Sequence, residues 1–234
     1  MRWFNSADKR WMLMLAWLLL AVTTATEARE VGPSQWHDAM DAFAAQDQAH
    51  PPPQKAVLFI GSSSFNYWHT LAQDFPGIPV INRGFGGSVI ADSTYYADRI
   101  VWPYHPRLIL MYAGDNDIAE GATPERVLAA FQAFVAKARK RLPDVPVVYV
   151  SIKPSVARWA LWPLMHEANE KIRAWAATQH GLRYVDIGPA MLDAQGKPRP
   201  ELFIADGLHM TPAGYALWIA ALKPVLAEYG FHTR

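Results

Sequence analysis

The chain has 234 residues, of which 51% are hydrophobic and 18% are charged. This length fits one domain with a substantial buried core, and the composition excludes an intrinsically disordered protein. The formal net charge is +1 and no long basic run occurs, so the electrostatic signature of nucleic-acid binding is missing. There is no cysteine, which excludes disulfides, thiolate metal sites and a cysteine nucleophile.

Residues 1–28 differ in composition from the rest of the chain. Basic residues come first, an apolar run over residues 11–22 follows, and small and polar residues extend to Ala28. This order predicts a secretory signal peptide with cleavage after Ala25 or Ala28, and hence export to the periplasm or secretion. A membrane span needs about 20 apolar residues, so an uncleaved anchor is the less favoured alternative and would be the protein's contact with a membrane.

The remaining chain is predicted to form an N-terminal helix with a proline-rich lead-in over residues 29–55, and a larger domain over residues 56–234. Residues 34–48 have apolar side chains at helical spacing, and prolines at residues 51–53 end this element. Five apolar runs typical of strands buried on both faces follow, at residues 56–60, 79–82, 108–112, 145–152 and 182–187. Helical patterns separate them, so we expect a three-layer α/β/α sandwich with a five-stranded parallel sheet.

In such sheets ligands bind beyond the carboxyl ends of the strands, and the first apolar run leads directly into Gly61, Ser62, Ser63 and Ser64. A serine at a tight strand-to-helix turn is a candidate nucleophile. A plain turn or a phosphate-binding loop is the alternative. The segment is neither a G-x-S-x-G elbow, because position 65 is Phe, nor a P-loop, because no Gly-Lys pair follows.

The second and third runs end in segments that could stabilise an anion. Residues 82–88 are glycine-rich, which lets backbone N–H groups approach a ligand, and Val89 breaks the dinucleotide-binding pattern. Asn116 follows the third run, and its amide is suited to bind a developing oxyanion. An Asx turn, or a metal site involving Asp115 and Asp117, is the alternative. We expect neither a metal nor a cofactor.

Asp206 and His209 form the last constellation, just before the final helical pattern. Gly207 allows a sharp turn, so the Asp206 carboxylate can fold back to Nδ1 of His209. This bond would leave Nε2 of His209 free as a general base.

Taken together, these residues resemble the SGNH/GDSL hydrolases, whose four blocks contribute Ser, Gly, Asn and His. The matching residues are Ser63, Gly87, Asn116 and His209. The resemblance spans residues 56 to about 228 and is greatest to the lysophospholipase-like and platelet-activating-factor-acetylhydrolase-like branches. It implies a flavodoxin-like sandwich and a catalytic domain over residues 56–234.

The resemblance also implies ester hydrolysis through an acyl-enzyme. Ser63, His209 and Asp206 would form the triad, and the N–H groups of Ser63 and Gly87 with the Asn116 amide would form the oxyanion hole. The family commonly has Gly-Asp-Ser in its first block, where this chain has Ser62 in place of the Asp. Because that Asp braces the loop, the replacement affects loop support, and Ser64 is the alternative nucleophile.

The sequence predicts the substrate less well than the reaction. Trp159 and Trp162 follow the fourth run and could line an acyl pocket or stack on a sugar, or could simply pack the next helix. Arg83 and Lys153 could meet a phosphate or carboxylate, or could be solvated loop charges. A lysophospholipid or other small ester, an O-acetylated carbohydrate, and ligand binding without catalysis are the three interpretations that we consider.

Overall fold

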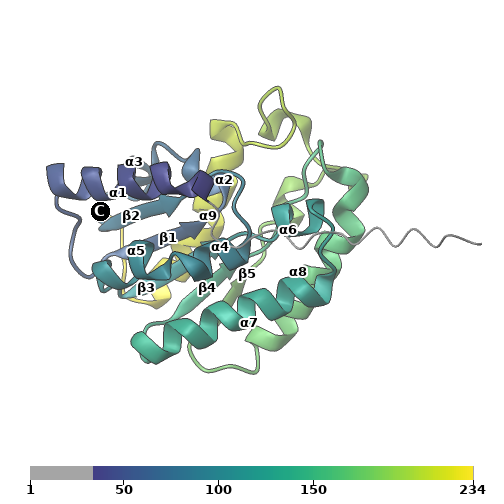
Figure 1. Cartoon of the computed structure of the whole chain (residues 1–234). Helices are drawn as coiled ribbons and strands as arrows, with labels where there is room; N and C mark the ends of the chain where they lie inside the picture. Colours follow the sequence, from purple (N-terminus) through teal and green to yellow (C-terminus); the bar gives the residue numbers. More distant parts are fainter. Residues whose placement is uncertain (1–33, 234) are drawn as a thin grey trace, which may run out of the picture. The chain divides into compact units, whose positions relative to one another are not determined.

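A computed structural model describes residues 34–233, so the predicted leader and its cleavage site lie outside the described residues. Five strands form one parallel sheet in the order β2-β1-β3-β4-β5 (Figure 1). Their bounds are Val57–Gly61 (β1), Val80–Gly84 (β2), Leu108–Tyr112 (β3), Val147–Val150 (β4) and Leu182–Val185 (β5). The predicted five-stranded parallel sheet is therefore confirmed.

The strands are apolar on both faces because both faces of the sheet are covered. In β1, Leu58 and Ile60 contribute to one hydrophobic core, while Val57 and Phe59 contribute to the other. β3 and β4 divide their side chains in the same way, as the period-two geometry of a strand requires. Burial on both faces explains why these strands read as unbroken apolar runs.

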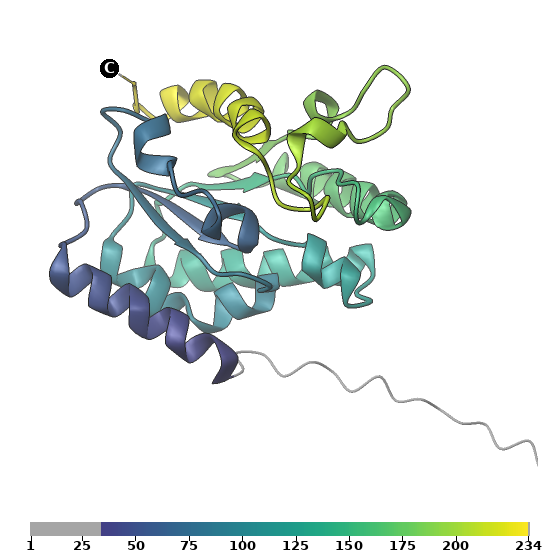
Figure 2. The same ribbon diagram turned by 90° about the horizontal axis from the view of Figure 1, so that it is seen from above.

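Helices cover the two faces as two layers, and Figure 2 shows α9 on one side of the sheet with α1 and α7 on the other. The first layer comprises α1 (His37–Ala49), α4 (Ile90–Tyr95), α5 (Ala97–Ile100), α6 (Asp115–Ala119), α7 (Pro124–Arg141) and α8 (Trp162–Ala176). The second comprises α2 (Ser63–Asn66), α3 (Leu71–Asp74) and α9 (Pro212–Glu228). Single 3-10 turns are η1 (Ser34–Trp36), η2 (Trp102–Tyr104), η3 (Trp159–Leu161), η4 (Pro189–Met191) and η5 (Pro200–Leu202).

The starts of α7 and α9 carry a local sequence signal, whereas the short helices carry none. Thr123 and Thr211 cap α7 and α9 by accepting hydrogen bonds from backbone N–H groups, and a proline follows each cap. Elements of four to six residues such as α2 and α3 are too short for a helical period to be visible in the sequence. Within residues 34–233 we find no helix that is both long and apolar enough to cross a membrane.

Candidate active site

The candidate site forms where β1 and β3 end side by side. Gly61 closes β1 with φ +124°, and a Cβ at this position would lie 2.0 Å from the carbonyl oxygen of Tyr112. Only glycine permits this approach. The backbone N–H of Ser62 then donates to the same carbonyl at 2.8 Å, and α2 starts at Ser63. Ser62 is still extended, and the chain turns from strand to helix at Ser63.

The three consecutive serines have different surroundings. Ser62 is fully buried, and its hydroxyl accepts a hydrogen bond from Asn116. Ser64 is 1% exposed, and its hydroxyl accepts one from Lys153 Nζ at 3.0 Å. Ser63 is the most accessible of the three, with 7% of its surface exposed. The hydroxyls of Ser62 and Ser64 therefore support the loop, and the environment favours Ser63 over Ser64 as nucleophile.

The side-chain amide of Asn116 lies in the first turn of α6 and faces the serine loop. Its Nδ2 donates to Ser62 Oγ at 2.8 Å and to the carbonyl oxygen of Ser88 at 2.9 Å. Asn116 thus ties the first block to the glycine-rich second block. Because both Nδ2–H groups are engaged, an oxyanion can bind here only if it replaces or shares one of these acceptors.

Gly87 lies in the glycine-rich loop after β2 with φ +75°, a conformation that favours glycine. Cη2 of Trp36 lies 3.3 Å from the position of a Cβ built on Gly87. The Trp36 ring also meets the ring of Phe85 edge-on, with centroids 5.3 Å apart. Trp36 therefore packs against the candidate oxyanion loop. Sequence reasoning missed it because no motif connects the lead-in helix with residues fifty positions later.

Asp206 and His209 are paired as the sequence predicts. Nδ1 of His209 lies 2.6 Å from Oδ2 of Asp206, while Oδ1 accepts from the backbone N–H groups of Leu208 and His209. Burial alone would raise the pKa of Asp206, but these hydrogen bonds outweigh it and lower the pKa to about 2. An ionised carboxylate only accepts, so Nδ1 carries the proton and Nε2 is left as the basic nitrogen.

Tyr67 brings the histidine loop to the serine helix. Its backbone N–H donates to the carbonyl oxygen of Ser63 at 2.8 Å, and its ring stacks on that of His209 with centroids 4.3 Å apart. The turn around Gly207 is held separately, because its carbonyl oxygen accepts from the N–H of Ala157 at 3.0 Å. The sequence does not predict this role for Tyr67, because only its position four residues after Ser63 connects it with the site.

A buried charge network lies behind the serine loop. Lys153, 1% exposed, contacts Tyr112 Oη at 3.0 Å and Asp115 Oδ2 at 3.4 Å, and Arg158 Nη1 lies 3.4 Å from the same oxygen. Burial favours the neutral acid, but the two cations outweigh it and lower the pKa of Asp115. Burial also lowers the pKa of Lys153, against the opposing charge of Asp115. The interpretation of Lys153 as a solvated loop charge is wrong.

Arg83 is likewise buried, which corrects its interpretation as a solvated charge. Its guanidinium forms an ion pair with Asp47 of α1 and donates to Tyr104 Oη at 2.6 Å and to the carbonyl oxygen of Asn82 at 2.6 Å. It also lies over the ring of Phe43. These contacts tie α1 to the end of β2, so Arg83 has a structural role and its charge is already compensated.

Trp159 and Trp162 stack on each other, with ring centroids 6.1 Å apart. Lys197 Nζ lies 5.1 Å from the Trp159 ring centroid. Trp162 lines a cavity of about 200 Å³ together with Tyr184 of β5. Trp162 also packs against the hydrophobic core, which favours the packing interpretation for this residue.

The carboxylates of Asp115 and Asp117, the alternative metal ligands, have protein partners. Asp115 belongs to the buried network, and both oxygens of Asp117 lie 3.3–3.4 Å from the backbone nitrogen of Ile90. Burial is the main cause that raises the pKa of Asp117 to about 7. Among residues 34–233, no group of three or more His, Asp or Glu side chains is arranged to hold a metal ion.

The fold and the serine-containing strand end define a class of hydrolase, and comparison with known proteins agrees. The model of the GDSL-like Lipase/Acylhydrolase family matches residues 60–217. A candidate platelet activating factor protein from Streptococcus pneumonia superposes with a TM-score of 0.73 at 20% identity, covering 81% of this chain and 92% of that one. A GDSL-like lipase from Bacteroides thetaiotaomicron gives a TM-score of 0.68 at 22% identity, covering 81% and 97%.

A variant of an acetyl-xylooligosaccharide esterase from Geobacillus Stearmophilus superposes with a TM-score of 0.60 at 17% identity, covering 78% of this chain and 98% of that one. At these identities the superpositions bear on the fold alone. Comparison with curated protein sequences gives no match. The family model covers well over half of the chain, so the protein belongs to the GDSL-like lipase/acylhydrolase family and is a serine hydrolase of ester bonds.

Proposed function

We propose that the protein hydrolyses carboxylic esters in two steps, with Ser63 as nucleophile, His209 as general base and Asp206 as the group that orients His209. The observation that carries this proposal is the bond from Asp206 to Nδ1 of His209, on a loop that Tyr67 joins to the Ser63 helix. A binding module without catalysis has no use for a base oriented in this way.

In the first step Ser63 Oγ attacks the ester carbonyl while Nε2 of His209 takes its proton. The tetrahedral oxyanion is held by the N–H groups of Ser63 and Gly87 and by the Asn116 amide, which exchanges its bond to Ser62 Oγ or to the Ser88 carbonyl for one to the oxyanion. His209 then protonates the leaving alcohol. In the second step His209 takes a proton from water while the water oxygen bonds to the acyl carbon. The bond from this carbon to Ser63 Oγ then breaks, His209 returns the proton to Oγ, and the acid is released.

The family resemblance favours lysophospholipid-like esters or esters of short and medium acyl chains, with O-acetylated carbohydrate as the alternative. The groove along β2, whose lining includes amide and imidazole side chains, supports the alternative. We also propose that residues 1–28 direct export and leave the enzyme in the periplasm or secreted.

The test is a series of p-nitrophenyl esters from acetate to palmitate, assayed with the unmodified protein, Ser63→Ala and Ser64→Ala. We expect Ser63→Ala to lower kcat/KM by at least roughly 10³-fold on every accepted ester, and Ser64→Ala to lower it less than about 10-fold. A fluorophosphonate probe followed by peptide mapping should modify Ser63. Turnover that survives Ser63→Ala, or labelling at Ser64, would overturn the assignment.

A further inference from the structure

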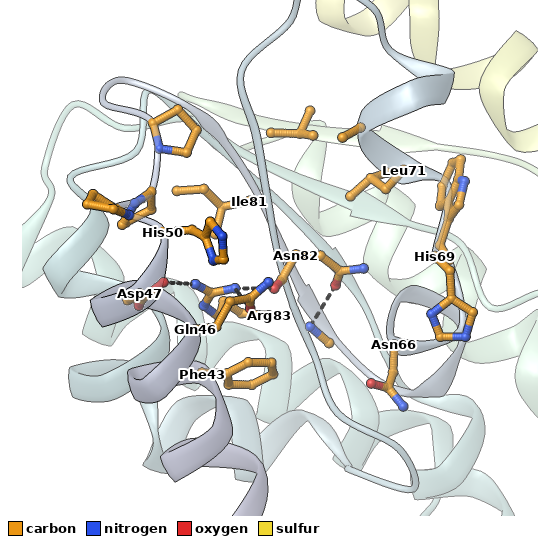
Figure 3. Close-up of a pocket in the computed structure, with 17 residues that line it drawn as sticks. Phe43, Gln46, Asp47, His50, Asn66, His69, Leu71, Ile81, Asn82 and Arg83 are labelled. Carbon is orange, nitrogen blue, oxygen red and sulfur yellow. Dashed lines mark hydrogen bonds and ion pairs between the residues drawn. The ribbon is translucent and has the colours of Figure 1, made fainter.

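A groove of about 560 Å³ runs along the outer edge of β2, which is the edge strand of the sheet (Figure 3). One wall comes from α1 and the prolines that follow it, and the other from the segment of α2 and α3. The floor is the whole of β2, about 13 Å long at the usual rise of a strand. A cavity of this volume falls in the range that holds small organic ligands.

One end of the groove adjoins the candidate active site. Asn66 lines the groove and is the last residue of α2, one helical turn after Ser63 and therefore its neighbour on the helix surface. Nδ2 of Asn66 lies 3.6 Å from the position of a Cβ built on Gly86, next to Gly87 in the candidate oxyanion loop. A molecule bound at Ser63 can therefore extend past Asn66 into the groove.

The lining combines polar and apolar side chains, and its one buried cation is already paired. Arg83 and Asp47 neutralise each other, so the groove does not present a free cation to a phosphate or carboxylate. The other polar side chains include the amides of Gln46, Asn66 and Asn82 and the imidazoles of His50 and His69, and the Asn82 amide is already bonded to the backbone of Phe65 and Gly84. Phe43, Leu71, Ile81 and the prolines supply apolar surface between them.

Such a mixture suits a hydroxyl-rich, uncharged molecule, because amides and imidazoles both donate to and accept from hydroxyl groups. An alkyl chain would instead remove water from these groups without replacing their hydrogen bonds, which costs free energy. The amides and imidazoles of the lining thus favour a sugar, whose apolar ring faces can also pack on Phe43 and the prolines, over a fatty chain.

We propose that this groove binds the alcohol part of the ester, and that this part is an uncharged sugar acylated on a hydroxyl. The inference rests on the proposed function, because it places the ester carbonyl at Ser63 and the sugar beyond Asn66. The wall formed by α1 lies outside the matched family region of residues 60–217, so this recognition would be specific to chains that carry the same lead-in helix.

The test uses two acetyl esters that give the same acyl-enzyme, an acetylated cello-oligosaccharide and p-nitrophenyl acetate. Ala72 is an exposed residue of α3 that lines the groove, so Ala72→Trp fills the groove without disturbing the core. Gln73→Trp is the matched control, since Gln73 is the exposed neighbour that does not line the groove. Thermal melting verifies that both variants fold.

We expect Ala72→Trp to lower kcat/KM for the acetylated oligosaccharide at least 10-fold, mainly through KM, while p-nitrophenyl acetate changes less than twofold. Gln73→Trp should change neither. The groove assignment is wrong if both substrates respond equally, if neither responds, or if the unmodified enzyme does not accept the sugar ester. Ser63→Ala tests the proposed function separately from the groove assignment. Loss of all turnover in this variant supports the proposed function, whatever the result for Ala72→Trp.

Discussion

The ring of Tyr67 stacks on the imidazole of His209, with centroids 4.3 Å apart and planes inclined by 26°. Tyr67 directly follows the short helix that Ser63 begins, and His209 lies on a loop that comes after β5 and 142 residues later in the chain. One exposed side chain thus sets where the proposed base stands relative to the proposed nucleophile.

Replacing Tyr67 should therefore affect catalysis more than stability. A stacked aromatic pair contributes about 0.5–1.5 kcal/mol, so Tyr67→Ala should lower kcat roughly 2- to 10-fold with little change in KM. Tyr67 is 46% exposed, and the melting temperature should change little. Tyr67→Phe keeps the ring and should restore kcat. Equal loss of kcat in both variants would indicate that the hydroxyl, not the stacking, matters.

Trp36 should act on the candidate oxyanion loop through its contact with Gly87. Trp36→Ala removes the ring that packs on Gly87 and Phe85, and we expect kcat to fall about 10-fold, less than the 10²–10³-fold that follows loss of an oxyanion donor. Trp36→Phe should recover part of the loss. Steady-state kinetics on a p-nitrophenyl ester provides the measurement.

Trp175→Ala is the matched control for Trp36→Ala. Trp175 is also partly buried and packs edge-on against Phe131, away from the loop after β2. Both variants lose packing, so both should melt at lower temperature, but only Trp36→Ala should lower kcat after correction for the folded fraction. A parallel loss of kcat in Trp175→Ala would contradict a positioning role for Trp36.

The buried carboxyl of Asp117 should make stability depend on pH. Its pKa is raised from 3.8 to about 7, so the folded protein holds this proton more tightly than the unfolded chain does. The associated stability is fully present below about pH 4 and is lost as pH rises towards 7, by up to roughly 4 kcal/mol.

Asp117→Asn removes this ionisation while keeping an oxygen that can accept from Ile90. Urea unfolding between pH 4 and pH 8 should show the unmodified protein losing stability with rising pH relative to Asp117→Asn. If the difference in unfolding free energy between the two proteins is constant across this range, the proposed pKa of Asp117 is refuted.

Removing one charge from the buried network should lower the free energy of unfolding. Lys153→Met leaves Asp115 buried with Arg158 as its remaining cation, and removal of one partner from a buried pair costs about 3–5 kcal/mol. The double variant Lys153→Met/Asp115→Asn removes both charges and should be more stable than Lys153→Met alone. Urea unfolding of the unmodified protein, Lys153→Met, Asp115→Asn and the double variant measures the coupling, and additive losses would show that the pair is not coupled.

Much of the fold follows from patterns that depend only on neighbouring residues. The apolar runs predict the strands because a sheet covered on both faces needs apolar side chains at every position. Thr-Pro pairs at 123–124 and 211–212 predict helix starts because the hydroxyl caps and the proline has no N–H to lose. The Asp206–His209 pair is also local, since three residues and a glycine turn suffice to form it.

The sequence by itself therefore determined the layers, the sheet and the ordered blocks of the GDSL-like family. It did not determine which of the three serines is accessible, that Arg83 and Lys153 are buried, or that Trp36 and Tyr67 contact the glycine loop and the histidine. Each of these depends on side chains from distant segments meeting in space. The spacing of neighbouring residues does not predict such contacts. Only the tertiary structure decides them, because it brings α1, β2 and the histidine loop around α2.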